Sequence, residues 1–144
     1  MSTQAMTQSM TPSRTAAPDL LRTALRVDSW STAAFGVVML ACAKWFDGLL
    51  GLPVNWSVAF GIAMLGGAAV LALIAGYPRI PARLAAAVVV VNSLSCVGLV
   101  LLACTDVVEL TALGRVFMVV GAVAVAVFGE FEFVGLRRVL GAAL

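Results

Sequence analysis

Two acids close a long apolar stretch near the C-terminus and are the first candidates for chemistry. The stretch Leu113–Arg138 reads LGRVFMVVGAVAVAVFGEFEFVGLRR, with Glu130 and Glu132 shortly before Arg137 and Arg138. Carboxylates at membrane depth are costly and rare, and they often mark ion, proton or ligand sites. Glu130 precedes Arg137 by seven residues, which is about 10 Å along a helix. We therefore expect Glu130 to lie within the membrane, below the headgroups.

The two acids cannot serve the same site. Ala122 and Ala126 lie two turns and one turn before Glu130 on the same helical face. A stripe of small residues that ends in an acid is predicted to point into a helix bundle, because a charge facing lipid is costly. Glu132 lies about 200° further around the helix. It is predicted to pair with an arginine at the interface.

Three interpretations of Glu130 stay open. The carboxylate can neutralise Arg22 or Arg26 and so fix the register between helices, which is a packing role common among membrane helices. It can instead bind a ligand, an ion or a proton in the interior of the bundle. It can also reach the lipid headgroups.

Asn92 is the most central strongly polar residue of the chain. It follows Arg83 by nine residues, which is about 13 Å along a helix, and it shares a helical face with Ser95 and Cys96. One interpretation is a hydrogen bond between helices. The other is a pocket lined by Asn92 and Glu130 that opens towards the cytoplasm, where an amphipathic ligand such as a lipid or a quinone would fit.

Asp28 stands where the first apolar stretch begins, beside Ser29, Ser31 and Thr32. It can cap that helix or pair with an arginine at the interface. Alternatively it joins the candidate ligand-binding residues, which are Glu130, Asn92, Asp28 and Ser95.

Composition excludes several kinds of chemistry. The chain has no histidine, no nucleophile elbow and no glycine-rich phosphate loop. Its cysteines, Cys42, Cys96 and Cys104, form no C-x-x-C pair, so we expect no metal. Cys42 and Cys104 lie at similar depth, which leaves a disulfide open. A net charge of +2 without a basic patch does not indicate nucleic acid as a partner. We expect a protein that is not an enzyme.

The elements that position these residues are predicted to be membrane spans. Of 144 residues, 62% are hydrophobic and 11% are charged, and the mean hydropathy is +1.10. A soluble domain is about half apolar and about a quarter charged. Apolar stretches of spanning length predict four helices, at about 29–46, 56–77, 84–105 and 113–136. Turns are predicted at Asp47–Asn55 and Pro78–Arg83.

The ends of the chain are predicted to flank one transmembrane domain, residues 19–138. Residues 1–18 are polar and predicted to be a disordered cytoplasmic tail. Asp19–Val27 is predicted to form an amphipathic helix at the membrane surface, and residues 139–144 form a short cytoplasmic tail.

Basic residues predict the orientation. Seven of the nine lie at the two ends of the chain or in the loop after the second span, and only Lys44 and Arg115 lie in the other two connections. By the positive-inside rule both termini are cytoplasmic, in the inner (plasma) membrane of a bacterium. Short loops then predict an all-α, antiparallel four-helix transmembrane bundle with consecutive spans as neighbours.

Small residues predict where these helices pack. Ala59, Ala63 and Gly67 repeat at every fourth position of the second span, which allows a second helix to approach closely. With Ala122 and Ala126, they form the predicted helix-packing set. The stripe favours a homo-oligomer or a larger membrane complex.

Two resemblances accompany this pattern. Leu25–Asp28, the turn Gly48–Pro53, Asn92 and Gly135–Arg138 resemble small uncharacterised integral membrane proteins of actinobacteria over nearly the whole chain. The segment from Arg26 to Pro53 resembles the first hairpin of DoxX-like membrane proteins. That second resemblance implies a four-helix fold and a role as an accessory of a quinone-linked oxidoreductase.

Three functions follow as hypotheses. The first is a non-catalytic membrane subunit or assembly factor. The second is a binder or transporter of a small molecule, lipid or quinone that uses Glu130 and Asn92. The third is the DoxX-like accessory role.

Overall fold

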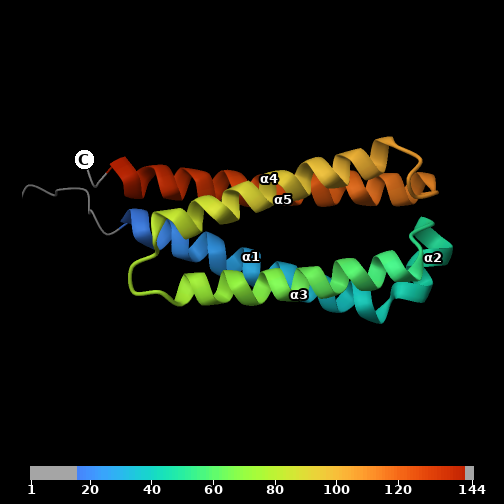
Figure 1. Cartoon of the computed structure of the whole chain (residues 1–144), viewed down its shortest axis with the longest axis horizontal. Coiled ribbons are helices and arrows are strands. Elements are labelled where there is room, and N and C mark those ends of the chain that lie inside the picture. The colour runs from blue at the N-terminus through green and yellow to red at the C-terminus, as the bar shows by residue number, and fades with distance from the viewer. Residues whose placement is uncertain (1–15, 142–144) are drawn as a thin grey trace, which may run out of the picture.

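The computed structural model describes residues 16–141, and this part of the chain contains helices and no strands. Residues 1–15 and 142–144 lie outside the described part, and of the two predicted tails residues 16–18 and 139–141 belong to helices. The five helices are α1 (Ala16–Ala41), α2 (Ala43–Leu50), α3 (Val54–Gly76), α4 (Ala82–Cys104) and α5 (Ala112–Gly141) (Figure 1). The all-helical prediction is confirmed for the described residues.

The first apolar stretch is divided differently from the prediction. The surface helix and the first span form one helix, α1, which ends at Ala41. After Cys42 the chain bends by 82° into α2. The predicted turn Asp47–Asn55 is wrong in its first half, because Phe46 and Leu50 give α2 a buried apolar face. The turn is confined to residues 51–53, where Gly51 has a left-handed backbone with φ of 67° and ends α2.

Three helices, α3, α4 and α5, are each long and apolar enough to cross a membrane. The bent pair of α1 and α2 meets the same criteria only when the two are taken together as one broken span. Three or four crossings therefore agree with helix length and composition.

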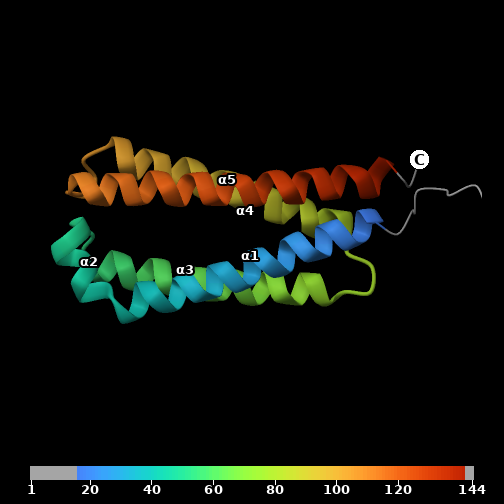
Figure 2. The ribbon, with the colours of Figure 1, turned by 180° about the vertical axis from the view of Figure 1, so that it is seen from behind.

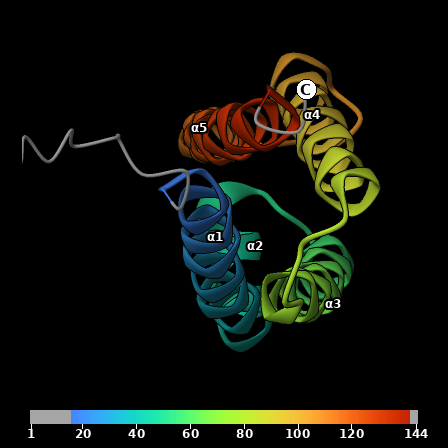
Figure 3. The same cartoon turned by 90° about the vertical axis from the view of Figure 1, so that its left-hand side faces the viewer.

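The long helices form two pairs that lie side by side (Figures 1 and 2). One pair is α1 with α3, the other is α4 with α5, and the contact between α1 and α5 joins them. Seen along the helices, α3 and α4 stand apart (Figure 3), and they barely touch. The prediction that all consecutive spans are neighbours is therefore wrong for α3 and α4. The loop between them crosses from one pair to the other.

Close approach of α1 and α3 depends on two glycines. A Cβ atom at Gly61 would lie 2.6 Å from Cγ of Leu40, and one at Gly36 would lie 3.1 Å from the carbonyl oxygen of Gly61. The predicted stripe of Ala59, Ala63 and Gly67 does not serve this contact, because all three are exposed. The stripe lies on the opposite side of α3 from the face that packs against α1.

Apolar side chains gather in two clusters, one towards each end of the molecule. The first contains Leu21 and Leu25 of α1 with Val88 and Leu136 of α4 and α5, near the end where α1 begins and α5 stops. The second surrounds Leu52 at the opposite end, where α2 lies across the helices. The polar side chains described below lie between these clusters.

Candidate functional site

Three helices contribute to a polar cluster in the interior. The side-chain amide of Asn92 in α4 donates through Nδ2 to Oε2 of Glu132 in α5, at 2.8 Å, and to Oδ2 of Asp28 in α1, at 3.3 Å. Thr32, one turn after Asp28, donates its hydroxyl hydrogen to Oδ1 of Asp28 at 2.9 Å. We call Asp28, Glu132 and the bridging Asn92 the acid pair and its bridge.

Both acids are removed from solvent. Glu132 is 0% exposed and Asp28 is 4% exposed. Oε1 of Glu132 is buried without a hydrogen-bond partner. A buried carboxylate oxygen without a donor is unfavourable and rare, so this atom is where the site is incomplete.

The positions of these residues follow from the apolar repeat of each helix. In each helix, apolar residues spaced three and four positions apart form the face that points inwards. Asp28, Asn92 and Glu132 each lie on that face of their own helix. In α5 the repeat is Met118, Ala122, Val125, Gly129, Glu132 and Leu136. In α1 it is Leu21, Leu25, Asp28, Thr32, Gly36 and Met39, and in α4 it is Ala85, Val88, Asn92, Cys96, Leu99 and Ala103. Packing of the apolar members therefore carries the polar ones inwards.

Large aliphatic side chains close the site on one side. Leu25, Val88 and Leu136 each lie one helical turn from a member of the cluster, towards the end where α1 begins and α5 stops. All three are buried. This layer separates the acids from that end of the molecule.

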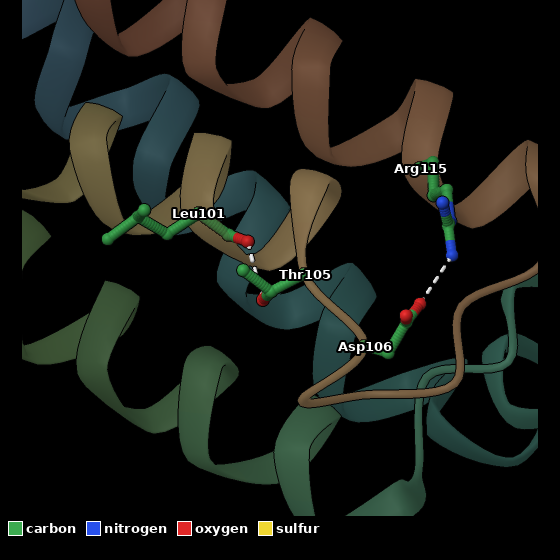
Figure 4. A network of polar contacts seen from close by, with 4 residues as sticks. All are labelled: Leu101, Thr105, Asp106 and Arg115. Atoms are coloured by element: carbon green, nitrogen blue, oxygen red, sulfur yellow. Dashed lines mark hydrogen bonds and ion pairs between the residues drawn. The ribbon is translucent and has the colours of Figure 1, made fainter.

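No base balances the acids in the described residues. The only ion pair there joins Arg115 and Asp106 at 2.8 Å, beside the turn that follows α4 (Figure 4). Thr105 continues this exposed network by donating to the carbonyl oxygen of Leu101. Arg22 instead donates to the backbone carbonyls of Tyr77 and Pro78.

The predicted placement of the two glutamates is wrong, because Glu132 and not Glu130 faces the interior. Glu130 is exposed and does not point into the bundle, and Ala126 is exposed with it, whereas Ala122 is buried. Glu132 does not pair with an arginine. The reason is rotational: the buried face of α5 is centred near Glu132, and Glu130 lies about 160° away on a helix of 3.6 residues per turn.

Glu130 lines an open groove on the outside of α5. The groove has a volume of about 590 Å³, and Leu20 of α1 forms part of its wall. Its other lining residues include Val127, Phe131 and Arg138. Asn92 does not line this groove. The groove is therefore not the predicted pocket that Asn92 and Glu130 would share.

The other predicted site residues divide between the cluster and the surface. The structure brings Asn92 together with Asp28, which neither caps a helix nor pairs with an arginine. Ser95 is exposed and lies outside the cluster. Cys42, Cys96 and Cys104 are free thiols, so Cys42 and Cys104 form no disulfide here.

Sequence reasoning missed Glu132 and Thr32 as members of the site. The alternating spacing of Met118, Ala122, Val125 and Gly129 predicts the interior face correctly and leads to Glu132. The spacing of four from Ala122 to Ala126 leads to Glu130 instead. The signal for Glu132 was present in the complete apolar repeat of the helix.

The chemistry of the cluster is that of hydrogen-bond acceptors, which suit a small, positively charged group. Ionised carboxylates accept hydrogen bonds and donate none. An ionised aspartate at the centre of a membrane helix costs about 2.5–3.5 kcal/mol on insertion scales. A ligand that neutralises charge at Glu132 therefore stabilises the folded chain.

No protein family, curated protein or solved structure matches this chain. Its class therefore comes from the fold and the site. The described part is an all-helical protein with at least three helices suited to cross a membrane.

Proposed function

We propose that this chain is an integral membrane protein that binds a monovalent cation, a proton or Na⁺, at the acid pair and its bridge. It would act as a small-cation carrier or as a subunit whose shape responds to the cation. The observation that carries the proposal is Oε1 of Glu132, which is buried without a donor next to a second acid.

The proposed membrane arrangement has four crossings, with α1 and the bent α2 as the first. The start of α1 and the end of α5 lie at the same end of the molecule, as an even number of crossings requires. Arg22, Arg137 and Arg138 lie near that end. We therefore place it in the cytoplasm, with the protein in the plasma membrane of a bacterium.

A cation that binds only the folded protein raises the thermal midpoint by mass action. Each tenfold excess over the dissociation constant adds about 1.4 kcal/mol to the free energy of unfolding. The experiment measures the thermal midpoint of the purified protein in neutral detergent. One series varies the pH, and another replaces Na⁺ by a large organic cation at constant ionic strength.

Glu132→Gln should abolish the cation dependence, whereas Glu130→Gln, which changes an exposed acid of the same helix, should retain it. A midpoint that responds neither to pH nor to Na⁺ in the unmodified protein would reject the proposed function. The acids would then have a structural role.

A second function is favoured by the exposed stripe on α3. Ala59, Ala63 and Gly67 are exposed, and a Cβ built at Gly67 would meet no atom of another described helix within 4 Å. Small residues that face lipid allow a helix of another subunit to approach. The stripe thus supports a role as a membrane subunit or assembly factor. Native mass spectrometry from mild detergent should find a dimer or a stoichiometric partner, which Ala63→Leu should dissociate; a monomer would reject this role.

A further inference from the structure

The four carboxylate oxygens of Asp28 and Glu132 differ in their hydrogen-bond partners. These differences indicate which cation would fit between the two acids. The inference that follows rests on the proposed function and names its ligand.

Three of the four carboxylate oxygens already accept a hydrogen bond. Oδ1 of Asp28 accepts from Thr32, Oδ2 of Asp28 accepts from Asn92, and Oε2 of Glu132 accepts from Asn92. Only Oε1 of Glu132 has no partner, and it is buried. The ligand is therefore expected at this fourth oxygen.

The group best placed to become a partner for Glu132 belongs to the other acid. Asp28 and Glu132 both accept from Nδ2 of Asn92, at 3.3 Å and 2.8 Å, so the two carboxyl groups lie close together. Two ionised carboxylates cannot form a hydrogen bond with each other, because both are acceptors only. A hydrogen bond between them requires one added proton.

Asn92 makes a metal ion a poor fit. Both carboxylates receive N–H groups from its amide nitrogen, so the space between them faces hydrogens that carry partial positive charge. An alkali cation needs several oxygen lone pairs there instead. Among the described residues, no group of three or more His, Cys, Asp or Glu side chains could hold a metal ion.

The surrounding helices supply no charge that would replace the proton. In α1, Arg22 is bonded to backbone carbonyls and Arg26 is exposed. The α3 helix has no charged residue. Arg83 is exposed on α4. On α5, Glu130, Arg137 and Arg138 are exposed, and Lys44 and Asp47 of α2 are exposed at the opposite end.

We propose that Asp28 and Glu132 share a single bound proton, held at Oε1 of Glu132, and that this proton is the ligand of the site. Binding transfers the proton from a hydronium ion: one O–H bond of hydronium breaks, one O–H bond forms at Oε1, and the charge of the pair changes from −2 to −1. Release is the reverse transfer, to water. The amide of Asn92 and the hydroxyl of Thr32 stabilise the remaining negative charge.

Proton release has a structural consequence at the contact between the two helix pairs. Asp28 belongs to the pair of α1 and α3, and Glu132 belongs to the pair of α4 and α5. Without the proton, two negative charges face each other across this contact. Deprotonation should therefore loosen the contact between α1 and α5.

Infrared spectroscopy of the whole protein in lipid vesicles tests the proposal. A protonated carboxyl group has a carbonyl stretch well separated from those of carboxylates and amides. We expect this band at neutral pH, its loss at alkaline pH, and no change when Na⁺ replaces a large organic cation. Incorporation of glutamate labelled with ¹³C at the side-chain carboxyl should shift the band, and this needs no variant that could misfold.

Variants then assign the proton. Glu132→Gln should remove the band and Glu130→Gln should leave it. A band that Na⁺ abolishes would identify Na⁺ as the ligand, which overturns this inference but leaves the proposed function standing. If the band is missing and the thermal midpoint changes neither with pH nor with Na⁺, the inference and the proposed function both fail.

Discussion

The amide of Asn92 serves two acids from two different helices. Its nitrogen Nδ2 donates to both Glu132 and Asp28, so a single side chain joins α1, α4 and α5. Apolar residues of similar size would fill this space without fixing the register of the three helices. The polar cluster therefore specifies how the helix pairs meet, as buried polar groups do in some other bundles.

Replacing Asn92 by leucine keeps the volume of the side chain and removes both donors. We expect Asn92→Leu to lower the free energy of unfolding by about 1–3 kcal/mol, because two buried acceptors lose their partner. The loss should be larger at alkaline than at acidic pH, since protonated acids can bond to each other. Chemical unfolding in detergent at both pH values measures this difference.

Ser95→Ala is the matched control, because Ser95 follows Asn92 by less than one turn but is exposed. Its free energy of unfolding should be nearly unchanged at either pH. An equal loss for Asn92→Leu at both pH values would show that the acids do not change protonation over this range.

Stability of the folded chain should fall as the pH rises through deprotonation of the acid pair. The folded state holds a proton that an unfolded carboxylate in water has already released, so unfolding releases protons. Midpoints of thermal unfolding at a series of pH values measure the slope. In Asp28→Asn the pair loses one acid, and the slope should become shallow.

At the scale of helices, the sequence predicts the presence and approximate length of each helix better than it predicts which face of the helix is buried. Helices α3, α4 and α5 overlap the predicted spans closely, because twenty or so apolar residues in a row leave little choice. Such uniform apolar helices have weak amphipathic character, so their buried face is poorly marked. The packing face of α3 was therefore predicted wrongly. In α5 the short stripe of Ala122 and Ala126 led to Glu130 instead of Glu132. Asn92, which is half-buried, makes the predicted hydrogen bond between helices.

The bend at Cys42 was also not predictable from composition. Trp45, Phe46 and Leu49 extend the apolar pattern of the first span, and a straight helix would satisfy it equally well. What turns the chain is tertiary: the backbone amide of Thr111 donates to the carbonyl of Leu50, and Phe46 packs on Phe117. These contacts join residues far apart in the chain.

Gly61 is expected to be intolerant of a side chain. A Cβ atom there would lie 2.6 Å from Cγ of Leu40 and 3.0 Å from the carbonyl oxygen of Gly36. Gly61→Ala should lower the free energy of unfolding by about 1–3 kcal/mol, because α1 and α3 must move apart. Unfolding in mixed detergents measures the change.

Gly66→Ala in the same helix is the control, since a Cβ at that position would meet no atom of another helix within 4 Å. It should be neutral or stabilising by up to about 1 kcal/mol, because alanine favours a helix. Equal effects of both substitutions would contradict the close contact between α1 and α3.

At the scale of the whole molecule, two hydrogen-bonded links among residues 16–141 join the helix pairs. One is the acid pair and its bridge, and the other joins Thr111 to the end of α2 through Leu49 and Leu50. The links lie at different heights along the bundle. The edge between α3 and α4, by contrast, has few contacts.

The orientation can be tested with the native thiol Cys104, which is exposed beside the turn after α4. With Cys42 and Cys96 replaced by serine, a membrane-impermeant maleimide should label Cys104 in right-side-out spheroplasts. Tyr77→Cys, in a chain with all three cysteines replaced by serine, should react only after the membrane is opened. The opposite pattern would reverse the proposed topology.

The members of the polar cluster lie far apart in the sequence, and this affects how the protein is synthesised and inserted. Asp28 and Asn92 are 64 residues apart, and Glu132 lies further on, in the last helix. A ribosome therefore delivers α1 into the membrane well before the groups that receive its acid exist. We expect nascent α1 to stay beside the insertion machinery, or shielded by a chaperone, until α5 emerges. Chains truncated before Glu132 should be the preferred targets of membrane proteases, because their Asp28 has no finished site to enter.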